Sequence, residues 1–291
     1  MAEVKKASPG IAGSIGAATV GSVAPVVTLP VGLACINKMS KINQELKPDQ
    51  FAKVNNAAEE VLKNLQLDKK GVKIVDIPAD SVMDMPNKFL CKLMELINPV
   101  YATAKGKNAF FTDTSMLGVI DANSVAVNKS KLPLATFHEL GHAHNYNYSK
   151  LFKCLQKMRT PGMLIASIMP LFCAFTKDSK PADGKELTGG QKFKNGLRKF
   201  APAIAGVAMA PTLIEELAAT SKGNKAAKEV LKDAPELLKK VVKGNRCGYI
   251  SYAVTIAGMA FATWAAKKIK DIAVQKKEEK LQNTRVGTKQ V

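Results

Sequence analysis

The residues with the clearest capacity for chemistry lie in one short stretch, Phe137 to Asn145, which holds all three histidines of the chain. His138, Glu139 and His142 form the pattern His-Glu-x-x-His. On an α-helix, side chains four residues apart lie on one face, so the two imidazoles can share one metal ion while Glu139 projects beside it. Two histidine ligands with a neighbouring carboxylate are typical of hydrolytic zinc sites. The pattern therefore predicts zinc (Zn2+) bound by His138 and His142, with Glu139 as the general base.

A third protein ligand has to come from outside this helix. His144 is two residues past His142 and projects about 200° away from it around the helix axis. Tyr148 stands where a third histidine would follow in the longer zinc pattern that contains three. The sequence therefore requires a distant carboxylate or cysteine. The alternative is that the histidines are ordinary packing residues on a helix face.

The chain is strongly basic, with a formal charge of +19 at pH 7, and lysine supplies nearly all of the positive charge. Nucleic-acid readout favours the arginine fork, and no nucleic-acid motif accompanies these lysines. We therefore expect attraction to anionic membrane lipid and no nucleic-acid partner. The five cysteines include no Cys-x-x-Cys pair, which indicates reduced thiols and not a disulfide framework.

Apolar stretches at both ends of the chain indicate an integral membrane protein. Residues 1–37 are predicted to form an apolar N-terminal membrane segment, because no charge occurs from Ala7 to Asn37. A cleaved signal peptide is the competing interpretation, although this stretch is longer and richer in glycine than such a signal. Residues 247–266 have the length of a transmembrane helix, and a charged tail, 267–291, follows them.

The middle of the chain, residues 38–246, is predicted to be a zincin-like metallopeptidase domain that contains an apolar hairpin, 161–214. The two runs of this hairpin, 161–176 and 200–214, are each shorter than the roughly 20 residues of a full membrane span. They can therefore be membrane helices or a buried hairpin in a soluble fold.

The rest of the domain has the pattern of an α+β, mostly helical protein. Asp49 is expected to cap a first helix, and a second is expected over 87–97. The apolar residues of the second helix are predicted to face inward: Phe89, Leu90, Leu93 and Leu96. Strand-like segments are expected near 72–77, 109–112, 117–120 and 124–127. We predict a zincin-like core in which a small β-sheet packs on the helix of His138, together with membrane-embedded helices.

Two adjacent glutamates, Glu215 and Glu216, follow the second run of the hairpin and are the carboxylates best placed to complete the site. A carboxylate in this position can reach the metal on a helix of its own. Adjacent acids beside an apolar run are otherwise common markers of a helix boundary. The residues alone leave Glu215 and Glu216 as alternatives.

The order of these motifs resembles one known family. Asn108-Ala109-Phe110-Phe111, then His-Glu-Leu-Gly-His, two apolar runs and Glu216-x-x-Ala219 follow one another over residues 50–220. The arrangement is similar to that of the membrane zinc metallopeptidases, gluzincins that include the CAAX prenyl endopeptidase and the bacterial heat-shock membrane protease.

The resemblance implies a zinc metalloendopeptidase that hydrolyses peptide bonds in extended segments of a peptide or protein, with its catalytic side in the cytoplasm. It implies that Glu216 is the third zinc ligand. It also implies that the substrate binds along an edge strand that includes Asn108, Ala109 and Phe110. Thr220 stands where the family has an aspartate, so the support of the metal helix is expected to differ.

Two other functions are consistent with the sequence. A catalytically inactive, zinc-stabilised membrane scaffold would bind anionic lipid through its lysines. A soluble peptidase would bury the apolar hairpin within its own core.

Overall fold

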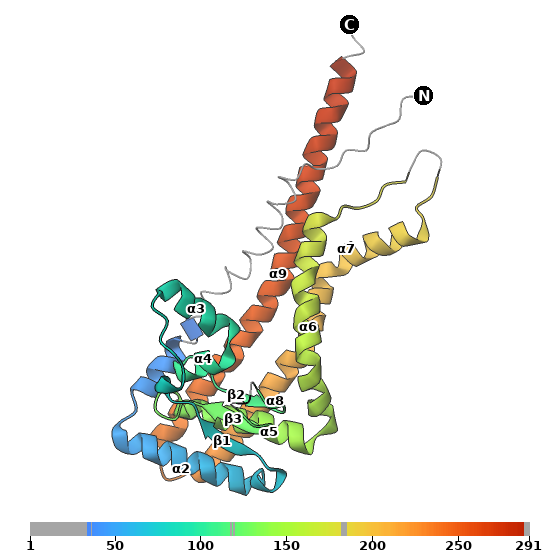
Figure 1. The fold of residues 1–291 in the computed structure, drawn as a ribbon. Coiled ribbons are helices and arrows are strands. Elements are labelled where there is room, and N and C mark those ends of the chain that lie inside the picture. Colours follow the sequence, from blue (N-terminus) through green and yellow to red (C-terminus); the bar gives the residue numbers. More distant parts are fainter. Residues whose placement is uncertain (1–33, 36, 117, 119, 182–184, 288–291) are drawn as a thin grey trace. The chain divides into compact units, whose positions relative to one another are not determined.

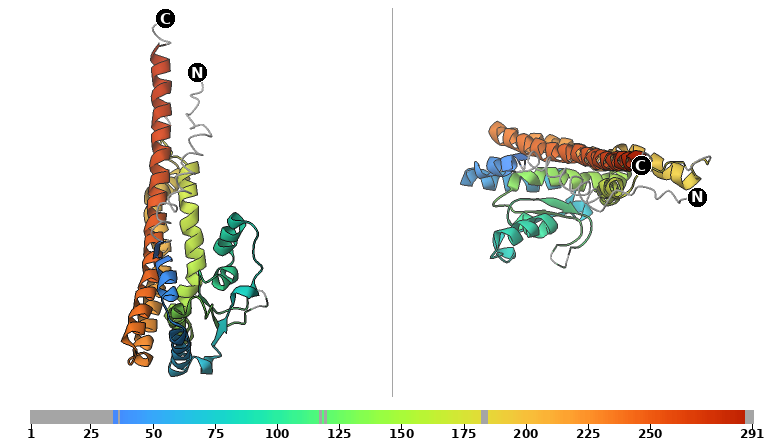
Figure 2. Two further views of the ribbon diagram at one scale, coloured as in Figure 1. Left: turned by 90° about the vertical axis from the view of Figure 1, so that its left-hand side faces the viewer. Right: turned by 90° about the horizontal axis from the view of Figure 1, so that it is seen from above.

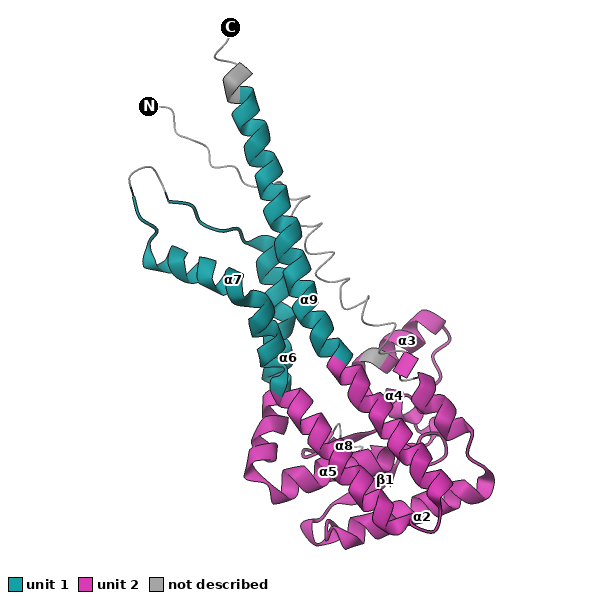
Figure 3. Cartoon of the chain, turned by 180° about the vertical axis from the view of Figure 1, so that it is seen from behind, with its two compact units in different colours: residues 1–30, 159–210, 254–291 teal, residues 31–158, 211–253 magenta. Residues whose placement is uncertain are grey.

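The computed structural model describes residues 34–35, 37–116, 118, 120–181 and 185–287 (Figure 1). The predicted N-terminal membrane segment therefore lies almost wholly outside the described residues. The chain divides into two compact units (Figure 3). Their described parts belong to the following ranges: 159–210 and 254–291 in unit 1, and 31–158 and 211–253 in unit 2.

Helices form most of the described chain. The helices of unit 2 include α2 (Pro48–Asn64), α3 (Lys88–Ile97), α4 (Pro99–Ala104) and α5 (Thr136–Tyr148). Longer helices follow them along the chain: α6 (Lys150–Phe175), α7 (Gly189–Ala208), α8 (Ala210–Val230) and α9 (Pro235–Gly287). Of these, α8 lies almost wholly in unit 2. The cap predicted at Asp49 is wrong by two residues, because Pro48 begins α2 and Lys47 is its N-cap. Proline is well suited to this first helical position, since it has no N–H to leave without a partner.

Unit 2 contains a sheet of three strands in the order β1-β3-β2. Their bounds are Lys73–Asp76 for β1, Phe110–Thr112 for β2 and Ser124–Val127 for β3. The central strand β3 is parallel to β1 and antiparallel to β2, so β2 is an edge strand. The strand predicted over 117–120 is replaced, in the residues described there, by a single antiparallel bridge between Met116 and Ile120. Gly118 lies between them with φ 69°, a turn conformation that favours glycine.

Helix α5 lies at the centre of the unit 2 core. Phe137 and Leu140 of α5 are fully buried in a cluster that includes Val125 of β3 and residues of α2, α8 and α9. On the other face of the sheet, Val100 of α4 packs in a second cluster that includes Ala126 of β3. The sheet therefore separates α4 from α5, and α5 is enclosed by packing on several sides (Figure 1). This confirms the prediction that a small sheet packs on the helix of His138.

Helix α3 forms where it was predicted, but its apolar residues face outward. Phe89 is 72% exposed, Leu90 43% and Leu93 39%. The side chain of Leu96 lies outside the described residues. The predicted inward orientation is wrong for Phe89, Leu90 and Leu93, because α4 covers this face of the sheet and α3 packs against α4.

Three helical segments are long and apolar enough to cross a membrane: Lys150–Phe175, Gly189–Val230 and Pro235–Thr284. Each segment is longer than the apolar run predicted there, because polar residues next to the run continue the helix. In their most apolar windows only 33%, 33% and 22% of the residues are buried. Most of these side chains therefore have no protein core to enter, which favours membrane association over a buried soluble hairpin. The predicted transmembrane segment 247–266 and most of the charged tail belong to one continuous helix, α9 (Figure 2).

A buried arginine joins the helices of unit 1. Arg198 of α7 is 0% exposed, and its guanidinium donates to the Asp178 carboxylate at 2.9 Å and to the Asp271 carboxylate of α9 at 2.5 Å. It also donates to the carbonyl oxygen of Cys173 in α6 at 2.8 Å. The arginine therefore ties the end of α6 to α7 and α9 where their apolar stretches give way to charged residues.

Candidate metal centre

The site is built where α5 and α8 approach each other closely. A Cβ added at Gly141 of α5 would lie 2.2 Å from the carbonyl oxygen of Ala219 in α8. A Cβ at Gly223 of α8 would lie 2.3 Å from the carbonyl oxygen of Phe137 in α5. Any side chain larger than hydrogen would therefore push the two backbones apart. Gly141, the glycine of His-Glu-Leu-Gly-His, therefore allows the α8 backbone to lie this close to α5.

Three side-chain atoms from these helices surround one point. Nε2 of His138 lies 3.0 Å from Oε2 of Glu216 and 3.0 Å from Nε2 of His142. Nε2 of His142 lies 3.5 Å from the same oxygen of Glu216. A tetrahedral zinc ion with bonds of 2.0–2.1 Å separates its ligand atoms by about 3.3 Å. The three buried residues therefore have a donor set and spacing that could hold a metal ion.

Glu215 contacts the opposite side of the His142 ring. Its carboxylate lies 2.6 Å from Nδ1 of His142, while Glu216 faces Nε2. Gln156 donates to the Glu215 carboxylate at 2.7 Å and to the carbonyl oxygen of His142 at 2.9 Å. Glu215 is therefore placed to hold the orientation of the His142 ring, as carboxylates beside metal-binding histidines commonly do.

The His138 ring has a different support. Oγ1 of Thr220 lies 3.2 Å from Nδ1 of His138. A hydroxyl oxygen can accept a hydrogen bond from a protonated Nδ1, so Thr220 can hold the His138 ring without adding a charge.

The carboxylates of Glu215 and Glu216 make this cluster of side chains attractive to a cation. Burial by itself lowers the pKa of His142, but the Glu216 and Glu215 carboxylates raise it to about 10. In the absence of a metal, His142 therefore carries a proton at neutral pH. His144 does not join this group: it stacks on Tyr148 with ring centroids 5.0 Å apart, and burial together with Lys222 lowers its pKa to about 4.

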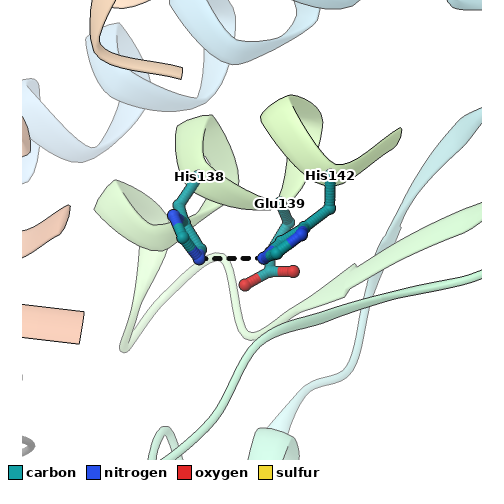
Figure 4. Close-up of side chains that lie close together, drawn as sticks. All are labelled: His138, Glu139 and His142. Atoms are coloured by element: carbon teal, nitrogen blue, oxygen red, sulfur yellow. Dashed lines mark hydrogen bonds between the residues drawn. The ribbon is translucent and has the colours of Figure 1, made fainter. Parts of the chain in front are cut away.

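Glu139 lies beside the two histidines. The side chains of His138, Glu139 and His142 leave α5 on the same side (Figure 4), and one ligand atom from each lies within 4.8 Å of the others. The Glu139 carboxylate also accepts a hydrogen bond from the backbone N–H of Phe111 in β2 at 2.9 Å. The predicted base is therefore close to the metal-binding atoms and faces the edge strand.

The contact between Glu139 and Phe111 identifies which groups of β2 face outward. In an antiparallel pair, the N–H and C=O of one residue point to the same side, and neighbouring residues alternate. The Phe111 N–H points to Glu139 and away from β3, so the C=O of Phe111 points away from β3 as well. The N–H and C=O of the neighbouring Phe110 then face β3, where Phe110 lies opposite Ala126. Asn108 and Ala109 lie immediately before β2. The alternation favours Ala109 and Phe111 over Phe110 for pairing with a peptide, and the substrate role of this segment stays a prediction.

Sequence reasoning missed two polar residues of this region. No sequence motif includes Gln156, so no sequence signal linked it to the site. Tyr146 lies four residues after His142 and eight after His138, so the helical spacing could have placed it on the metal-binding face. Its ring centroid lies 5.7 Å from that of Phe111. Burial and a hydrogen bond with Asp113 raise the pKa of Tyr146 to about 12, so its hydroxyl keeps its proton.

Gly223→Ala is expected to weaken metal binding at least tenfold and to lower the stability of the protein. The added methyl group meets a backbone carbonyl, so α8 and its glutamates must move away from the histidines. Gly244→Ala is the matched control, because a Cβ at this helical glycine of α9 meets nothing within 4 Å. Metal titration and thermal unfolding of both variants test this, and equal metal affinity in the two would contradict it.

No family model, curated protein or solved structure matches the chain.

Proposed function

We propose that the chain is a membrane-anchored zinc endopeptidase that cleaves extended segments of peptides or proteins. The observation that carries this proposal is the convergence of His138, His142 and Glu216 on one point, with Glu139 beside them. The order of the motifs, which resembles that of the membrane zinc metallopeptidases, supports the same assignment.

Zinc is the metal that fits this donor set best. Two imidazole nitrogens and one carboxylate oxygen match the ligands of many catalytic zinc sites, whereas calcium and magnesium prefer oxygen ligands alone. Held by His138, His142 and Glu216, a zinc ion would supply one chemical effect here: it would lower the pKa of a water molecule towards neutrality.

We assign proton transfer, orientation of the histidine rings and substrate binding to different residues of the chain. Glu139 accepts the proton of the attacking water and can later deliver it to the leaving amine. Glu215 and Thr220 hold the two histidine rings. The outward backbone groups of β2 bind the substrate as an added strand, which requires an unfolded or loop-like segment.

The membrane setting follows from α8. This helix carries Glu215 and Glu216, and it lies within the candidate span Gly189–Val230. Hydrolysis would therefore take place next to the membrane and not in bulk water. All five cysteines are free thiols. This agrees with a catalytic side in the cytoplasm, where thiols stay reduced.

The direct test uses the full chain purified in detergent. We expect one zinc ion per chain by elemental analysis and cleavage of an unfolded protein substrate. Chelation should stop the cleavage, and added zinc should restore it. Stoichiometric zinc without cleavage of any peptide in a diverse library would favour the inactive scaffold.

Zinc affinity is expected to fall as the pH is lowered. Because the pKa of His142 in the metal-free protein is about 10, zinc must displace a proton at neutral pH. The apparent association constant should therefore rise about tenfold for each pH unit between pH 6 and 8 for every proton displaced. Competition with a chromophoric chelator across this range measures the slope, and an affinity independent of pH would contradict the assignment of His142 as a ligand.

A further inference from the structure

Helix α3 carries an apolar face that no described part of the protein covers. We call Phe89, Leu90, Leu93 and Ile97 the α3 apolar face. Phe89 is 72% exposed and Ile97 62%, and no described side chain of α3 is buried. On a helix these four positions fall within about 100° of one another, so they form one continuous stripe. Met83, just before the helix, is 82% exposed and adds to the apolar surface near it.

The charges of α3 fit an anionic partner. Lys88 and Lys92 are both exposed and project from the side that adjoins the stripe, with Lys92 about 60° from Phe89. The one acid of the helix, Glu95, is half-buried, and its carboxylate lies 3.8 Å from Sγ of Cys91. An apolar stripe bordered by lysines is typical of helices that lie in a membrane interface. The lysine stems cover apolar surface while their ammonium groups reach lipid phosphates.

The position of α3 within unit 2 agrees with a lipid partner. Figure 3 shows α3 at the end of unit 2 where α9 passes out of this unit. Helix α9 forms a candidate membrane span from Pro235 to Thr284, so α3 and this candidate span lie together at one end of unit 2.

We propose that the α3 apolar face inserts into the surface of an anionic bilayer, with Lys88 and Lys92 on the lipid phosphates. The insertion gives unit 2 a second attachment to the membrane besides its helices. This inference depends on membrane association and is independent of the zinc site and of proteolysis.

The experiment places a fluorescent reporter on the stripe. In full-length protein reconstituted into vesicles, Phe89→Trp is combined with Trp264→Phe, which removes the single native tryptophan. Lipids brominated near the headgroup end of their acyl chains quench tryptophan that lies among them. Glu60→Trp in the same background is the control, because Glu60 is exposed on α2. A thermal unfolding midpoint equal to that of the wild type shows that each variant is folded.

We expect brominated lipid to quench the Phe89→Trp variant severalfold more strongly than the Glu60→Trp variant. In vesicles with anionic lipid, adding Lys88→Glu and Lys92→Glu should reduce this quenching, whereas neutral vesicles should show little difference. Emission typical of water without quenching would overturn the proposal. Blue-shifted emission without quenching would also overturn it, because a second copy of the chain or another protein segment would then cover the face. Equal quenching with and without Lys88→Glu and Lys92→Glu in anionic vesicles would show that these lysines do not bind the lipid phosphates.

Discussion

Glu139→Gln is expected to lower kcat for peptide hydrolysis by about 10²–10⁴-fold, the usual contribution of a positioned general base. The amide keeps the size of the side chain and its carbonyl oxygen can still accept the hydrogen bond from the Phe111 N–H. It cannot take a proton from water at neutral pH. Since Glu139 is not one of the three ligands assigned to the metal, the variant should still bind one zinc ion.

The comparison needs zinc content and kinetics from the same preparations. Glu60→Gln, on the exposed face of α2, removes the same charge far from the histidines in sequence and should leave both quantities unchanged. If Glu139→Gln cleaved peptides at the wild-type rate, Glu139 would not be the base. If it lost its zinc, Glu139 would have to be treated as a ligand.

Glu216→Ala is expected to abolish stoichiometric zinc binding, whereas Glu215→Ala should retain zinc with an affinity lowered about 10–100-fold. The two neighbours differ in the atom that each contacts. Glu216 lies at Nε2 of both histidines, and Glu215 lies at Nδ1 of His142. Both side chains are fully buried, so burial by itself does not distinguish their substitutions.

The measurement is zinc stoichiometry and affinity for both variants at one pH, with thermal unfolding in chelator as the measure of fold. The prediction is wrong if Glu215→Ala loses zinc and Glu216→Ala keeps it. In that case the ligand would be shifted by one residue. The ring of His142 would then have to bind the metal through Nδ1.

The sequence pattern was sufficient to predict the part of the site that lies on α5, which is His138, Glu139 and His142. A spacing of four residues determines that His138 and His142 share a face, because the helix itself imposes it. The edge strand near Phe110 and the central strand over 124–127 were likewise predicted as strand-like segments. The sheet order was not visible, since the parallel pairing of β1 with β3 brings together segments distant in sequence.

The other half of the site could not be derived from local pattern. Whether Glu215 or Glu216 faces the metal depends on the rotation of α8 about its axis, and close packing against α5 sets this rotation. The glycines at 141 and 223 permit that packing, but a glycine within a helical pattern does not reveal which helix approaches it. The roles of Gln156 and Thr220 likewise depend on tertiary contacts.

The error over α3 has a physical cause of the same kind. Its residues have the periodicity of a helix with one apolar face, and periodicity cannot tell a protein core from a lipid surface. Helix α4, which begins at Pro99, covers the face of the sheet that α3 would otherwise have occupied.

The most direct test of the account is peptide-bond cleavage by the zinc-loaded full chain in lipid vesicles. A proteome-derived library of unfolded peptides is incubated with the wild type and with Glu139→Gln, and new peptide termini are identified by mass spectrometry. The account predicts new termini with the wild type, their loss on zinc chelation, and their absence with Glu139→Gln. Zinc bound at one ion per chain, with identical termini in all three samples, would contradict it.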